Sequence, residues 1–113
     1  MRLRSDFWVS AYIRRREIEG ASAMLRRRGA AEAGAIFIKI DRLDGRACLY
    51  APAPQSEIGE RGVERQWTRA HREEWLEPAE IETRLRKQIS YDPDIWIIEV
   101  EDREGRHNLD LAR

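Results

Sequence analysis

Residues 34–52, GAIFIKIDRLDGRACLYAP, decide the fold of this chain. Isoleucine recurs at every second position of 36–40, so one face of a strand there is wholly β-branched. Asp44 and Gly45 follow, and both residue types tolerate the positive φ that a tight hairpin turn requires. After the turn, Ala47, Leu49 and Ala51 again occupy every second position, so they share one face of a second strand. The stretch therefore predicts a hairpin whose isoleucine face turns inward, and we expect both helices of the chain to cover that face.

A first helix is predicted before this hairpin, over residues 6–19. Ser5 is a suitable N-cap, and Gly20 is suited to the position just after the last helical residue. Apolar residues also alternate over 6–13, so a strand in that part stays an alternative.

A second helix is predicted to begin at Pro78, because the missing N–H of proline costs nothing at the first helical position. Isoleucine and leucine recur at every fourth position over 81–89, which predicts a buried stripe. Glu82 and Arg86 are spaced for an exposed ion pair. The helix should end before Pro93, because the residue before a proline avoids the α region.

The remaining strands are predicted at 21–28, at 65–69 and at 95–100. The second of these is typical of a half-solvated edge, whereas the third is apolar on both faces and should be central. Residues 107–111 form either a short last strand or a frayed end, and 51–62 should be the longest loop. The predicted fold is a single α+β domain of 113 residues: an antiparallel sheet of four or five strands with two helices packed on one face.

Charge is abundant and unevenly distributed along the chain. Charged residues make up 37% of the sequence, yet the formal net charge is zero. Residues 1–56 carry a net charge of +5 and residues 57–113 a net charge of −5. We expect the two halves to pack together and to neutralise each other, and the alternative is a basic face for an acidic partner.

Three segments resemble a known family: RRRGAAEAGAIFIKIDRLDG, DPDIWIIEVEDREGRH, and WVSAYIRRREIEG near the start. They are similar to small alphaproteobacterial proteins grouped as domain-of-unknown-function family 1491. The resemblance extends from about Leu3 to Asp110. It implies a cytoplasmic bacterial protein with a compact α+β fold, and it implies no activity, cofactor or catalytic residue.

Few residues in the sequence point to chemistry. Cys48 is the only cysteine and we expect it to be a buried, inert thiol, which fits a reducing cytoplasm. His71 and His107 stand apart without cysteine partners, and each is expected at the surface. The sequence contains no signal-peptide pattern, membrane span, phosphate-binding loop or nucleophile motif. We therefore predict no cofactor, no metal site and no membrane association.

Arginine and tryptophan dominate the residues that could form a binding surface. The candidate interaction surface comprises Arg14, Arg15, Arg26, Arg28, Trp67 and Trp75. Exposed tryptophan beside arginine is typical of protein interfaces. We therefore expect a small cytoplasmic protein, not an enzyme, that acts through protein–protein contacts, with a second copy or another protein as partner. The alternative is weak binding of nucleic acid or a phosphate ligand through an arginine-rich face, and an enzyme is the least favoured of the three.

Overall fold

The computed structural model describes residues 3–54 and 65–112. Two helices and five strands follow one another along the chain: α1 (Ser5–Ile18), β1 (Ser22–Arg27), β2 (Ile36–Asp41), β3 (Ala47–Pro52), β4 (Trp67–Arg69), α2 (Pro78–Tyr91) and β5 (Trp96–Glu101). The α+β class is confirmed, and residues 6–13 are helical as predicted, so the strand that stayed an alternative for them is wrong. Most of the loop predicted at 51–62 lies outside the described residues.

The five strands form one sheet in the order β1-β5-β2-β3-β4. Strands β2 and β3 make the predicted hairpin, in which Gly45 has a φ of 85° and Leu43 a φ of 66°. Strand β5 is interior, as its two apolar faces predicted, and it runs parallel to β2 and antiparallel to β1. The sheet is therefore mostly antiparallel with one parallel pair.

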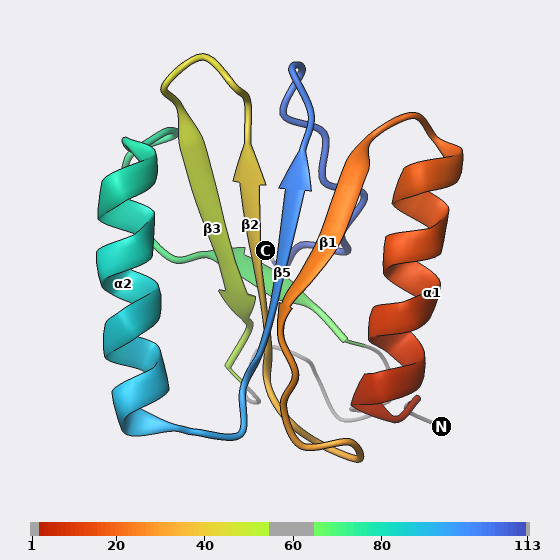
Figure 1. Ribbon diagram of the computed structural model, residues 1–113. Helices are drawn as coiled ribbons and strands as arrows, with labels where there is room; N and C mark the ends of the chain where they lie inside the picture. Colours follow the sequence, from red (N-terminus) through yellow and green to blue (C-terminus); the bar gives the residue numbers. More distant parts are fainter. Residues whose placement is uncertain (1–2, 55–64, 113) are drawn as a thin grey trace.

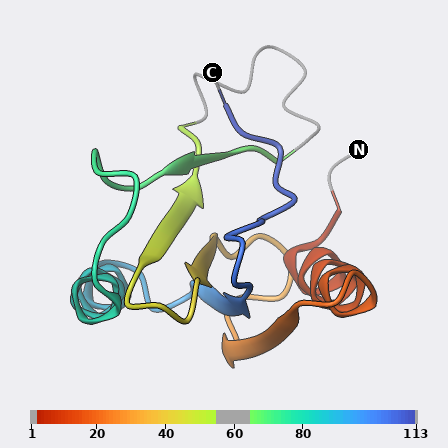
Figure 2. The same cartoon turned by 90° about the horizontal axis from the view of Figure 1, so that it is seen from above.

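The two helices lie on opposite faces of the sheet, which corrects the prediction that both pack on one face (Figures 1 and 2). One buried cluster joins Val9 and Tyr12 of α1 to the isoleucines of β2. The other joins Ile81 and Leu85 of α2 to Phe37, which lies between those isoleucines in the sequence. Since successive strand residues point to opposite faces, β2 is covered on both sides.

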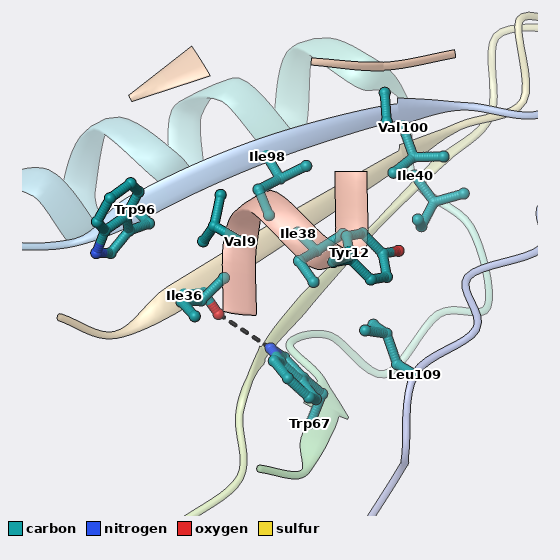
Figure 3. Close-up of a cluster of buried hydrophobic side chains, with 11 residues drawn as sticks. Val9, Tyr12, Ile36, Ile38, Ile40, Trp67, Trp96, Ile98, Val100 and Leu109 are labelled. Carbon is teal, nitrogen blue, oxygen red and sulfur yellow. Dashed lines mark hydrogen bonds between the residues drawn. The ribbon is translucent and has the colours of Figure 1, made fainter. Parts of the chain in front are cut away.

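The isoleucine face of β2 is the centre of the larger cluster, as predicted. Ile36, Ile38 and Ile40 are at most 1% exposed. Figure 3 shows them between α1, the β5 side chains and Trp67, whose indole N–H donates a hydrogen bond of 3.0 Å to the carbonyl of Ile36. Trp67 is 3% exposed although β4 is an edge strand, so the half-solvated edge predicted for 65–69 is wrong at this residue.

The glycine-bracketed segment at residues 29–34 packs the first residues of α1 against the end of the sheet where β2 and β5 begin. A Cβ atom on Gly29 would lie 2.2 Å from the Asp94 carbonyl oxygen, and one on Gly34 would lie 2.5 Å from the same atom. Only glycine permits this approach of two backbones. The buried Ser5 hydroxyl donates to the Gly34 carbonyl at 2.7 Å, which fixes the start of the helix.

Within the described parts of the chain, neither helix is long and apolar enough to cross a lipid bilayer. The second helix begins at Pro78 and ends before Pro93, as predicted.

Candidate interaction surface

The side of α1 that faces the sheet is formed by Ser5, Val9, Tyr12 and Arg16. These residues are spaced three or four positions apart, so they lie on one side of the helix. All four are at most 5% exposed. Tyr12 also donates from its hydroxyl to the carbonyl of His107 at 2.6 Å, which ties the helix to the C-terminal segment.

The opposite side of α1 is also apolar. Phe7, Ala11, Arg14 and Ile18 are again spaced three or four residues apart, and all four are exposed. Phe7 is 58% exposed and Ile18 is 76% exposed. Leu3, four residues before Phe7, is 54% exposed. Leu3 precedes the helix, so we call Phe7, Ala11, Arg14 and Ile18 the outer stripe of α1; a surface helix usually places polar side chains there.

Two arginines, Arg14 within the outer stripe and Arg15 beside it, have no ion partner among the described residues. No carboxylate of residues 3–54 or 65–112 lies within 4.0 Å of the Arg14 or Arg15 guanidinium groups. Arg4 differs, because it pairs with Asp6 at 3.2 Å and lies 5.3 Å from the centre of the Phe7 ring. Arg14 and Arg15 therefore add positive charge to an exposed apolar surface, and no carboxylate of the described segments pairs with it.

Arg16, which directly follows Arg14 and Arg15 in the sequence, is buried. The Arg16 side chain is 2% exposed and donates to Glu19 at 2.8 Å and to Asp102 at 2.9 Å. Asp102 also accepts from Arg106 at 2.9 Å. Burial by itself would raise the pKa of Asp102, but the Glu104 N–H and the two arginines hold it below its usual value. This network joins α1 to the turn after β5.

Arg26 belongs to a second ion cluster, on the α2 face of the sheet. Its guanidinium lies 2.7 Å from Glu82 of α2 and 3.0 Å from Glu99 of β5. The buried Lys39 ammonium also lies 2.7 Å from Glu82. The hydrogen bond from Arg26, with that from Lys39, lowers the pKa of Glu82 to about 2. The predicted pair of Glu82 with Arg86 is therefore replaced by contacts with the sheet.

Both ion networks pair cations of the N-terminal half with carboxylates of the C-terminal half. The expected neutralisation between the two halves of the chain is confirmed at these sites.

The other candidate residues lie outside the outer stripe of α1, and Trp67 instead packs against Trp8 of that helix, with the two ring centres 4.6 Å apart. The Arg28 guanidinium lies 5.3 Å from the centre of the Trp96 ring. Trp75 is half-buried, with the Arg42 guanidinium 5.0 Å from its ring centre. Trp67 is in the core and is not part of any surface. The structure thus groups Arg14 and Arg15 but does not bring the six candidate residues together.

Cys48 and the two histidines, which the sequence singled out for possible chemistry, are buried or half-buried. Cys48 is 2% exposed and burial raises the pKa of its thiol, as expected for an inert cysteine. His71 is 8% exposed, which corrects its predicted surface position. Its Nε2 accepts the Leu49 N–H at 3.0 Å while its Nδ1 lies 2.8 Å from the Glu73 carbonyl, so the neutral ring fits both contacts. Burial lowers the pKa of His71 and, with nearby Arg16, that of His107.

A small cavity of about 170 Å³ lies where β2 and β4 begin and β3 ends. Arg65 is the one ionisable residue of its described lining, which otherwise consists of Ala33, Ala35, Ile36, Pro52, Ala53, Gln66 and Trp67. Arg65 donates to the Leu3 carbonyl at 2.8 Å and to the Ser5 hydroxyl at 3.1 Å. An acid–base pair requires two converging ionisable groups, and the described lining does not supply them. No group of three metal-binding side chains occurs in the described segments.

Sequence reasoning missed the outer stripe and the buried Arg16. Both sets recur at helical spacing and could have been recognised, since Arg16 follows Tyr12 by four residues and Ile18 follows Ala11 by seven. The ion cluster around Glu82 had no comparable signal, because its members come from β1, β2, β5 and α2.

These features define a small α+β protein with a five-stranded open sheet between two helices. The family model described as "Protein of unknown function (DUF1491)" matches residues 3–110, and the chain belongs to this family. The predicted family is confirmed.

Solved structures of relatives have the same fold. The crystal structure of a DUF1491 family protein from Caulobacter crescentus CB15 is 35% identical, with a TM-score of 0.81, and each chain covers 100% of the other. The solution structure of protein Atu0922 from A. tumefaciens is 38% identical, with a TM-score of 0.82, over 98% of this chain and 95% of that one. No curated protein matches the chain at a significant level.

Proposed function

We propose that this chain is a non-catalytic cytoplasmic protein that acts through contacts with other proteins, and that the outer stripe of α1 is its contact surface. The observation that carries the proposal is the exposure of Phe7 and Ile18 on the side of α1 that faces away from the sheet. A helix that is apolar on two opposite sides is typical of one that is covered on both.

The exposed apolar area is costly unless a partner covers it. Full burial of a leucine- or phenylalanine-sized side chain stabilises an assembly by about 1.5–3 kcal/mol. Two such side chains, flanked by arginine, have the composition of an interface centre. The alternative, binding of nucleic acid or a phosphate ligand, has weaker support. Two of the arginines that such a face would need, Arg26 and Arg28, already contact Glu82 and Trp96.

The test is the double variant Phe7→Glu/Ile18→Glu, compared with Tyr91→Glu as matched control. Tyr91 is 72% exposed at the end of α2, on the other side of the sheet. Size-exclusion with light scattering reports self-association, and affinity capture with quantitative mass spectrometry reports other partners. We expect the wild type and the control to retain the same specific protein and the double variant to lose it. A wild-type chain that is monomeric and retains nothing beyond the double variant would contradict the proposal.

A further inference from the structure

We infer that the partner of the outer stripe is an acidic amphipathic helix of another protein, lying antiparallel to α1 with carboxylates opposite Arg14 and Arg15. The inference rests on the proposed function and names the chemistry of the occupant.

The shape of the outer stripe fits a helix. Phe7 and Ile18 are eleven residues apart, which corresponds to about 16 Å along the helix axis. Ala11 lies between them with a small side chain, so the axis of a second helix can approach closely at the middle of the stripe. Larger apolar side chains then flank this point at Phe7 on one side and at Ile18 on the other.

The charge of the outer stripe selects an acidic partner. Arg14 lies within the stripe and Arg15 beside it, and neither has a carboxylate within ion-pair distance among the described residues. A guanidinium that is covered by an apolar partner must gain a carboxylate, because burial of an unpaired charge is unfavourable. Arginine suits this role because its planar group binds carboxylates through two hydrogen bonds.

The helix dipoles determine the direction of the partner. Arg14 and Arg15 lie in the C-terminal half of α1. In an antiparallel pair this half meets the N-terminal half of the partner, where acidic side chains are favoured by the partner's own dipole. We therefore place the acidic residues of the partner in its first two turns.

A second copy of this chain is a poorer complement. In a symmetric antiparallel pair of α1 helices centred between Ala11 and Arg14, the two Arg14 side chains approach each other near the axis. The partner stripe then offers Phe7, Ala11 and Ile18, none of which is a carboxylate. Like charges at the centre of an interface oppose association.

The experiment uses the full chain and three helix-stapled peptides of the same length. Each peptide repeats the apolar spacing of the outer stripe, and its flanking positions in the first two turns are all Glu, all Gln or all Lys. Fluorescence anisotropy measures the dissociation constants at low salt. Arg14→Glu/Arg15→Glu is the charge-reversed variant, and Tyr91→Glu is the control.

We expect the Glu peptide to bind the wild type most tightly. The charge-reversed variant should bind the Glu peptide about tenfold more weakly than the wild type does, and it should prefer the Lys peptide. Circular dichroism melting verifies that both variants fold. Equal binding of the three peptides, together with loss of all three in Phe7→Glu/Ile18→Glu, would leave the proposed function in place and overturn the acidic partner. A dimer in light scattering that this double variant dissociates would show that the occupant is a second copy. Absence of binding of all three peptides by a monomeric wild type would overturn the acidic helix, and the affinity capture described above would then decide the proposed function separately.

Discussion

Replacing Asp102 by Asn should strongly destabilise the fold, because Arg16 would lose its buried counter-charge. The Arg16 side chain is 2% exposed and that of Asp102 is 3% exposed. The Arg16 Nη2 atom lies 2.9 Å from the Asp102 Oδ2 atom. Breaking a buried pair on one side typically costs 3–5 kcal/mol. We expect about 3 kcal/mol, at the lower end of this range, since Glu19 still pairs with Arg16 at 2.8 Å and is partly solvated. In a domain of this size the loss corresponds to a melting temperature lower by about 12 °C.

The substitution is selective. Asparagine keeps the Oδ1 atom that accepts the Glu104 N–H at 2.9 Å, so the turn after β5 retains its hydrogen bond. The matched control is Asp44→Asn, which removes a surface ion pair of 3.5 Å with Arg42. We expect the control to cost about 0.5 kcal/mol or less.

Urea unfolding followed by circular dichroism measures both free energies. The double variant Arg16→Met/Asp102→Asn removes both charges, so it should be about 2 kcal/mol more stable than the sum of the single effects predicts. If Asp102→Asn cost no more than Asp44→Asn, or if the two single effects simply added, the buried ion network would not have the role that we assign to it.

Three further predictions concern other parts of the fold. The pKa of Glu82 is lowered to about 2 from 4.5, so its stabilisation is complete above pH 4.5 and is lost as the pH falls toward 2. Because its side chain is 29% exposed, we expect a loss of about 2 kcal/mol after screening; acid titration of the unfolding free energy should show a flatter profile for Glu82→Gln. The pKa of His71 is lowered by burial, so the stability that depends on the neutral ring is complete above pH 6.5 and declines as the pH falls below it; the slope between pH 6.5 and 5 should shrink in His71→Gln, and an unchanged slope would count against the neutral ring. Gly29→Ala should cost about 1–3 kcal/mol because its Cβ would meet the Asp94 backbone, whereas Gly45→Ala, with open space around it and a φ of 85°, should cost about 1 kcal/mol; calorimetric melting of both variants distinguishes the two costs.

The secondary structure was largely predictable because its signals are local. Pro78 begins α2 and Pro93 lies just beyond its end, for reasons that depend on the backbone of neighbouring residues alone. The isoleucine alternation of 36–40 likewise predicted a buried strand, since the side-chain period of a strand is two. The interior position of β5 followed from its apolar character on both faces.

The candidate surface was less predictable because exposure is not a local property. Arg14, Arg15 and Arg16 are adjacent in the sequence, yet the first two are exposed and the third is buried beside Asp102. Trp67 was expected at a half-solvated edge, but its ring lies 4.6 Å from that of Trp8 of α1 and its backbone pairs with Leu111. Neither neighbour is near Trp67 in the sequence.

The sequence by itself determined the order of the helices and strands, their ends to within two residues, and which side chains of α1 share a side. Only the tertiary structure decided which of the two apolar sides of α1 faces the sheet, and that α2 covers the opposite face of β2. The physical reason is that helical spacing defines both sides of α1 equally well. The choice between them is made by the insertion of β5 between β1 and β2, which pairs residues 60 to 79 positions apart and so creates the surface on which Val9 and Tyr12 are buried.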